Sequence, residues 1–272
     1  MLVGGVLFGF GMMRARGCGA RALVLLGQGN LRSLVVLLCL GITGYMTFSG
    51  VLGPIRTALT DLSAVSVHSA TFSTEMGRWS FIAAMTLVIG AFLLRDRKFL
   101  QQRMALASGL IIGLLVVAGW LVTGWIGADD FDPIAVVSLT FVAPIGATIQ
   151  YAMIATGMTL NFGIVVVVGI VLGSFISAKA TGRFILTGFE RPTDMPRYLL
   201  GASCMGIGGA LAFGCSIGQG LTGMSTLSIW SMVALSGIIV GGWLGLRLEG
   251  LTPTTSEPVQ RQAAGSEHPQ QT

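Results

Sequence analysis

The chain has 272 residues, of which 53% are apolar and only 10% are charged. Ordinary soluble proteins carry about 25% charged residues, more than twice the fraction found here. The mean hydropathy of the chain is +0.82. So few charges cannot cover the surface of a soluble fold of this length. The composition therefore excludes a soluble protein and predicts an all-α, polytopic membrane protein. The net charge of +5 comes from basic residues scattered through short loops, which does not indicate nucleic-acid binding.

A membrane-spanning helix needs about 20 mostly apolar residues, and several continuous segments approach that length. In chain order they cover residues 32–52, 78–94, 104–128, 133–156, 160–178 and 227–246. Two further apolar stretches are interrupted. Arginines divide the stretch 2–29, and closely spaced glycines divide the stretch 198–225.

The loops between these segments indicate how the chain is oriented. The densest basic loop, 95–103, is expected in the cytosol, and counting spans from it places residue 31 inside and 179–197 outside. The loop 179–197 has four basic and two acidic residues. An outside position for it conflicts with the usual excess of basic residues in cytosolic loops. Either one span is miscounted or those charges serve an extracellular purpose. From residue 250 to 272 the chain has little to bury, and we expect a disordered tail.

The interiors of the expected spans contain no acidic residue, lysine, arginine or histidine. Pumps that relay protons commonly carry such residues within the membrane, so a carboxylate relay is disfavoured. The chain also has no Walker A, G-x-S-x-G or HExxH motif, and its four cysteines form no CxxC pair. We therefore expect neither an enzyme nor a bound metal or other cofactor.

Two segments of the chain resemble each other. Residues 4–18 read GGVLFGFGMMRARGC and residues 201–215 read GASCMGIGGALAFGC, so G-x-G-x5-G-C occurs twice at an offset of 197. Five spans are expected between the copies, and an odd number gives them opposite orientations, the pattern of an inverted-topology repeat. We expect a single transmembrane domain over 1–249, with repeat halves near 1–103 and 104–249.

The glycines of both copies predict that each stretch forms two half-helices that dip into the membrane and return, in a re-entrant manner. The alternative is close packing between unbroken helices. At each break the second half-helix would present free N–H groups and the positive end of its dipole, which suits an anion. A thiol there is a weak donor and a polarizable contact. The candidate substrate-binding residues are Cys18, Cys215, Gly17, Gly19, Gly214 and Gln219.

Packing is the alternative role for both motif cysteines, and it is the expected role of Cys39 and Cys204. Cys39 lies in an unbroken apolar run, and Cys204 aligns with a leucine of the first copy. Gln28 follows the first motif as Gln219 follows the second, but an amide at a turn often only satisfies backbone groups.

Three stretches resemble the YeeE/YedE family of sulfur transporters: GVLFGFGMMRARGCGARALVLLGQGNLRSLVVLL, GSFISAKATGRF and LGASCMGIGGALAFGCSIGQGLTGMSTLSIWSMVAL. The resemblance implies a multi-pass permease of the bacterial inner membrane that takes up thiosulfate between cysteine thiols. Cys18 and Cys215 match the two motif cysteines. The resemblance also implies a small cytosolic sulfurtransferase of the TusA type as a partner, besides the lipid bilayer.

Members of that family carry a further N-terminal hairpin with another cysteine, whereas this chain begins almost inside the first motif. The start is then trimmed, or a partner supplies the segment, or the protein works with two thiols. Two other functions stay open. One is a non-transporting membrane subunit that anchors a cytosolic sulfurtransferase, and the other is a carrier of another small inorganic anion, such as a selenium species.

Overall fold

The computed structural model describes residues 1–62, 87, 95, 103–127, 136–188, 194–226 and 228–250. Within these ranges the chain is helical with short connections, and one isolated bridge joins Asn30 to Thr187. The all-α prediction is therefore confirmed. The expected span 78–94, apart from one residue, and the expected disordered tail beyond residue 250 lie outside the described residues.

Four helices of the described part are long and apolar enough to cross a membrane. They are α3 (Leu31–Phe48), α7 (Arg103–Leu121) continued by the π-turn η1 (Val122–Ile126), α9 (Phe162–Ala180) and α11 (Ile229–Gly250). These helices match the expected segments 32–52, 104–128, 160–178 and 227–246. Their outward-facing leucines and isoleucines are largely exposed, which is the surface that lipid tails cover in a membrane protein.

The expected span over 133–156 is wrong. Residues 136–141 are not helical, and the helix that follows, α8 (Val142–Met153), has only 12 residues, too few to cross a bilayer. Non-helical backbone at this depth needs hydrogen-bond partners, and hydroxyl groups supply them. Thr123 Oγ1 donates to Val137 O at 2.7 Å and Thr222 Oγ1 to Leu139 O at 2.8 Å. Ser138 Oγ in turn donates to Val116 O of α7 at 2.8 Å, which ties the segment to that helix.

Both interrupted stretches are broken at their Gly-Cys motifs. In the first, α1 (Leu2–Arg14) ends and α2 (Gly19–Gly27) begins after Cys18. In the second, α10 (Met195–Leu211) ends and a helical segment containing the π-helix η4 (Gly218–Gly223) begins after Cys215. α1 packs mainly against α10 and α11, whereas α2 packs against α3 and α9. The halves of the first stretch thus have different partners, and a re-entrant course stays a prediction.

The two copies pack against each other through α1 and α10, which run in opposite directions. A Cβ on Gly4 would lie 2.6 Å from the nitrogen of Ala212, and a Cβ on Gly201 would lie 2.7 Å from the nitrogen of Ala15. These are the same contact with the two copies exchanged. Small residues allow such close approach of helices in membranes. The antiparallel arrangement is seen directly in these contacts, although one of the five segments counted as spans is not a continuous helix.

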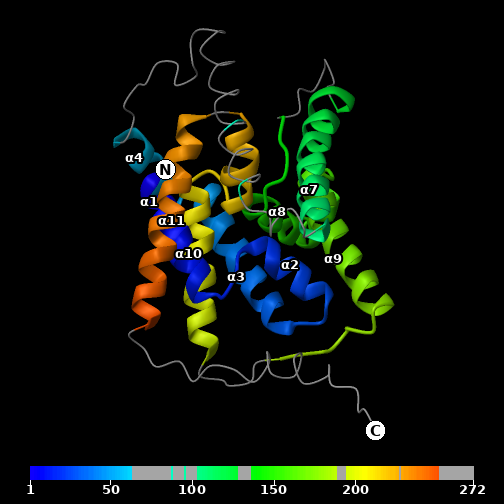
Figure 1. The fold of residues 1–272 in the computed structure, drawn as a ribbon. Coiled ribbons are helices and arrows are strands. Elements are labelled where there is room, and N and C mark those ends of the chain that lie inside the picture. The colour runs from blue at the N-terminus through cyan, green and yellow to red at the C-terminus, as the bar shows by residue number, and fades with distance from the viewer. Residues whose placement is uncertain are drawn as a thin grey trace.

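Figure 1 shows α1, α10 and α11 together on one side of the bundle, α7 and α9 on the other, and α2, α3 and α8 between them. The segment after α9 passes beside the α2–α3 loop and is hydrogen-bonded to it. Leu31 N donates to Thr187 O at 2.9 Å, and Thr187 N donates to Gly29 O at 3.1 Å. Residue 31 and the start of the 179–197 loop therefore lie on the same face. Their expected placement on opposite faces is wrong, because a span was miscounted.

Candidate functional site

The same turn precedes both motif cysteines. After α1, Gly17 N donates to Met12 O at 3.0 Å, and after α10, Gly214 N donates to Gly209 O at 2.9 Å. These six-to-one bonds, together with a left-handed residue, form the Schellman motif that ends many helices. The left-handed residues are Arg16 and Phe213, each with φ +56°, although neither is a glycine.

Cys18 is the N-cap of α2. Its backbone is extended, its carbonyl accepts from Ala22 N at 3.0 Å, and no side chain caps the first turn. The uncapped N–H groups of the helix start are suited to an anion beside this thiol. The side chain is half-buried. The sequence-based placement of Cys18 at the start of a half-helix is thus seen in the structure.

Cys215 also begins a helical segment, since its carbonyl accepts from Gln219 N at 2.8 Å. In contrast to Cys18, its side chain is buried, with 3% exposed, and Sγ accepts from Gly218 N at 3.2 Å. The two motif thiols therefore differ in access, since Cys18 is half-buried and Cys215 is enclosed.

Thr140 is a neighbour of Cys215 that sequence reasoning missed. A Cβ on Gly218 would lie 2.8 Å from Thr140 Oγ1 and 3.6 Å from Cys215 Sγ, so the absence of a side chain at Gly218 lets hydroxyl and thiol approach. Thr140 lies in the apolar run that was predicted to be a span, and no local pattern distinguishes it. Only the tertiary structure brings it here.

Gln219 has a structural contact. Its buried Nε2 donates to Ala212 O at 2.8 Å, at the end of α10, and a Cβ on Gly214 would lie 3.1 Å from its Cγ. The amide thus holds the turn that carries Cys215. Gln28 is exposed at the C-terminal end of α2. Binding by Gln219 stays a prediction.

The remaining glycines and cysteines mainly shape the packing. A Cβ on Gly19 would lie 3.3 Å from the side chain of Ile145, and one on Gly17 would lie 3.1 Å from Arg21 Cδ. Cys39 contacts Ser203 Oγ at 3.2 Å between α3 and α10, so its expected packing role is confirmed. Cys204 is half-buried on α10.

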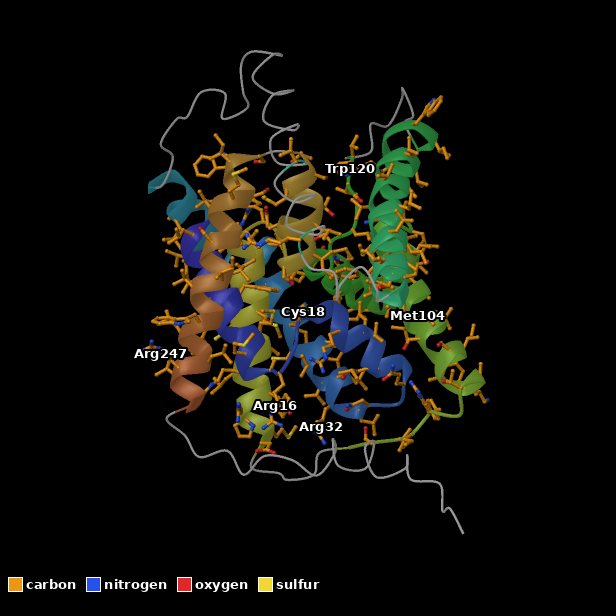
Figure 2. The ribbon with its side chains drawn as sticks, in the orientation of Figure 1. Arg16, Cys18, Arg32, Met104, Trp120 and Arg247 are labelled. Atoms are coloured by element: carbon orange, nitrogen blue, oxygen red, sulfur yellow. The ribbon has the colours of Figure 1, made fainter. Side chains whose placement is uncertain are left out.

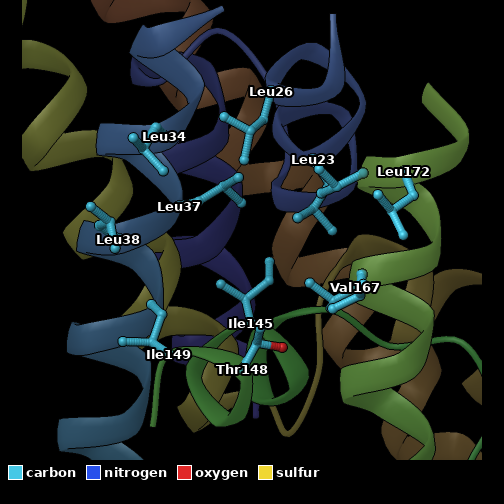
Figure 3. A pocket seen from close by; sticks show the side chains of 12 residues that line it. Leu23, Leu26, Leu34, Leu37, Leu38, Ile145, Thr148, Ile149, Val167 and Leu172 are labelled. Carbon is cyan, nitrogen blue, oxygen red and sulfur yellow. The ribbon is translucent and has the colours of Figure 1, made fainter. Parts of the chain in front are cut away.

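Two cavities differ sharply in chemistry. One of about 330 Å³ opens at Cys18 and has basic walls that include Arg16, Arg21 and Arg32; Figure 2 shows Arg16 and Arg32 below Cys18. The other, of about 270 Å³, lies between α2, α3, α8 and α9 and is lined by leucine, isoleucine and valine, with Thr148 as its one hydroxyl (Figure 3). An anion would lose its hydration there without replacement. Only the first cavity suits an ion.

The family model described as sulphur transport matches residues 1–244. The chain belongs to the sulphur transport family. The resemblance inferred from the Gly-Cys motifs is thereby confirmed, and the family is one of transporters. As a member of the sulphur transport family with several apolar spanning helices, the chain is a multi-pass membrane protein.

Two curated relatives within the sulphur transport family are similar to most of this chain. A thiosulfate transporter TsuA of Escherichia coli (strain K12) is 26% identical over 269 residues, which cover 90% of this chain and 70% of the relative. A thiosulfate transporter TsuA of Spirochaeta thermophila is 27% identical over 270 residues, which cover 89% of this chain and 75% of the relative.

Proposed function

We propose that the protein is a permease that moves thiosulfate across the bacterial inner membrane along a route between Cys18 and Cys215. Two observations support this: the names of the two relatives, and the pairing of one open and one enclosed thiol at equivalent turns. The second observation carries the mechanism, because it identifies where an ion would meet the protein's polarizable groups.

The chemistry of the turns suits a sulfur oxyanion. Thiosulfate carries two negative charges and a terminal sulfur. The N–H groups at the start of α2 favour negative charge, while a neutral thiol offers a weak hydrogen bond and a soft contact. Weak interactions of this kind hold an ion briefly and let it leave, which is what conduction requires. No covalent bond to the ion is involved.

Opposite chain directions of α1 and α10 support an inverted-topology repeat, in which each copy brings its cysteine from one side of the membrane. In this conformation the ion can reach Cys18 through the basic cavity. Cys215 lies in one buried apolar cluster with Phe141 and Val142, so the ion passes Cys215 only when this cluster opens. The described conformation is therefore one that is open toward the Cys18 side.

The face that carries the basic cavity is the cytosolic one, because the arginines of that cavity, beside the α2–α3 loop, and the basic start of the 179–197 loop lie there together. Thiosulfate is thus delivered to the cytosol beside Cys18. A soluble sulfurtransferase of the TusA type collects it on this face.

Uptake of ³⁵S-thiosulfate into proteoliposomes tests the route, with Cys18→Ser and Cys215→Ser compared with Cys204→Ser as a matched control. We expect at least tenfold slower uptake in the first two variants and wild-type uptake in the control. Full uptake in both motif variants would remove the thiols from the mechanism. No uptake by the wild type, together with copurification of a sulfurtransferase, would instead support an anchoring subunit. Stronger competition by selenite than by unlabelled thiosulfate would reassign the ion.

A further inference from the structure

We propose that the cavity at Cys18 is an anion-holding vestibule in which Arg16, Arg21 and Arg32 keep a doubly charged anion beside the thiol before release. This proposal rests on the proposed function for the identity of the ion, but not for the existence of the site. It adds three binding residues to the motif cysteine: Arg16 in the turn before Cys18, Arg21 on α2 and Arg32 at the start of α3.

The cavity is enclosed by the turn after α1, by α2 and by the beginning of α3. Its volume of about 330 Å³ accommodates a small hydrated oxyanion. Besides the three arginines, its walls contain hydrogen-bonding groups of Ser33 and Tyr198, and the thiol of Cys18 lies in its lining. The residues that line it include no aspartate or glutamate.

A specific backbone feature places each arginine. The left-handed conformation of Arg16, with φ +56°, turns its side chain away from the path of α1. The missing side chain of Gly17 leaves room for Arg21, whose Cδ lies 3.1 Å from where a Cβ would be. Arg32 is oriented by its Nε, which donates to Gly188 O at 2.9 Å.

No ion pair joins Arg16 or Arg21 to a carboxylate within the parts of the chain that the structure describes. Like charges in a partly enclosed cavity with low-dielectric walls concentrate counter-ions and accelerate their arrival by ~10- to 1,000-fold. The helix start at Cys18 adds a further partial positive charge. A dianion gains more from this field than a monoanion.

The second copy shows that this cluster is not a by-product of the turn. The position equivalent to Arg16 is occupied by Phe213, with the same φ and 45% of its surface exposed. The backbone of the turn therefore tolerates an apolar side chain. An arginine occupies this position only in the first copy, whereas at the second turn the Phe213 ring lies 5.6 Å from the guanidinium of Arg56.

Charged thiol reagents test the vestibule on the full-length protein in detergent. The rates at which an anionic and a cationic methanethiosulfonate modify Cys18 are measured by mass spectrometry of the peptide that contains it. We expect the anionic reagent to react faster than the cationic one. Arg16→Gln combined with Arg21→Gln should lower the ratio of the anionic to the cationic rate about tenfold. Arg14→Gln is the matched control, because it removes the same charge two residues away, where the guanidinium lies 5.8 Å from the Phe10 ring.

A second measurement uses sulfate and thiosulfate as probes. Millimolar concentrations of either should slow modification of Cys18 by neutral iodoacetamide in the wild type and in Arg14→Gln, but not in the double variant. Arg16→Lys with Arg21→Lys keeps the charge and should retain protection, which separates charge from folding damage. Equal rates for both charged reagents, or unchanged selectivity in the double glutamine variant, would overturn the vestibule.

These outcomes are separable from those of the uptake experiment. Charge selectivity at Cys18 together with full uptake by both cysteine variants would leave the vestibule standing and reject the thiol route. Uptake that depends on the thiols, without charge selectivity at Cys18, would support the thiol route and reject the vestibule.

Discussion

Arg16 and Phe213 lie 197 residues apart and occupy the same position in two equivalent turns, each with φ +56°. Each is followed directly by Gly-Cys, and each turn is closed by matching backbone hydrogen bonds. An arginine and a phenylalanine share no chemistry that would favour this conformation. The turn is therefore determined by its helix end and glycine, and the side chain at its left-handed position is available for function.

The left-handed backbone of Arg16 can be tested by two substitutions. Arg16→Asn should fold normally, because asparagine tolerates the left-handed backbone conformation. Arg16→Val should lower the free energy of unfolding by about 1–2 kcal/mol, because the branched Cβ of valine is strained in that conformation. Thermal unfolding in detergent measures both. Arg14→Val, within α1, serves as the control and should cost less than about 0.7 kcal/mol. Equal stability of the two valine variants would contradict the turn geometry.

The close contact of α1 and α10 predicts a large effect of one methyl group. A Cβ on Gly208 would lie 2.7 Å from Gly4 O, so Gly208→Ala should destabilise the protein by about 1–3 kcal/mol through overpacking. Gly173→Ala on α9 is the matched control. Nothing lies within 4 Å of a Cβ there, and we expect a neutral or slightly stabilising effect because alanine favours the helix. Similar melting temperatures for both variants would be inconsistent with the packing.

Gln219→Leu should separate a structural role from a binding role. The substitution leaves the buried Ala212 O without its 2.8 Å partner, which costs about 1–3 kcal/mol. Gln28→Leu, at an exposed position, should change stability little. If Gln219 also binds the ion, the KM for uptake per folded protein rises as well. An unchanged melting temperature with a raised KM would show that binding alone is its role.

The hydroxyl of Thr222 holds the non-helical segment beside Cys215. Thr222→Val removes its bond to Leu139 O, 2.8 Å long, and should lower stability by about 1–2 kcal/mol while increasing access of thiol reagents to Cys215. Thr226→Val is the control, because the exposed Thr226 hydroxyl bonds only to Gly223 O, one turn earlier. Unaltered labelling of Cys215 in Thr222→Val would show that this bond does not restrain the segment.

Much of the fold could be predicted from the residues themselves. Scarce charge and long apolar runs require helices in a bilayer, because each backbone group must be satisfied within its own segment. The breaks at Cys18 and Cys215 could also be predicted, since clustered glycine weakens a helix wherever it occurs. These are local or compositional effects, and they do not depend on which segments later meet.

The failures concern long-range contacts. Residues 136–141 look like part of a spanning helix, because hydropathy depends only on residue type. It contains no information about the hydroxyls of Thr123 and Thr222, which donate hydrogen bonds to carbonyls of this segment. That error placed the 179–197 loop on the wrong face. The gathering of Arg16, Arg21 and Arg32 around one thiol was missed for the same reason. Composition and glycine spacing determined that this chain is a broken-helix membrane protein, whereas the fold alone decided which polar groups meet, because those distances depend on packing between segments far apart along the chain.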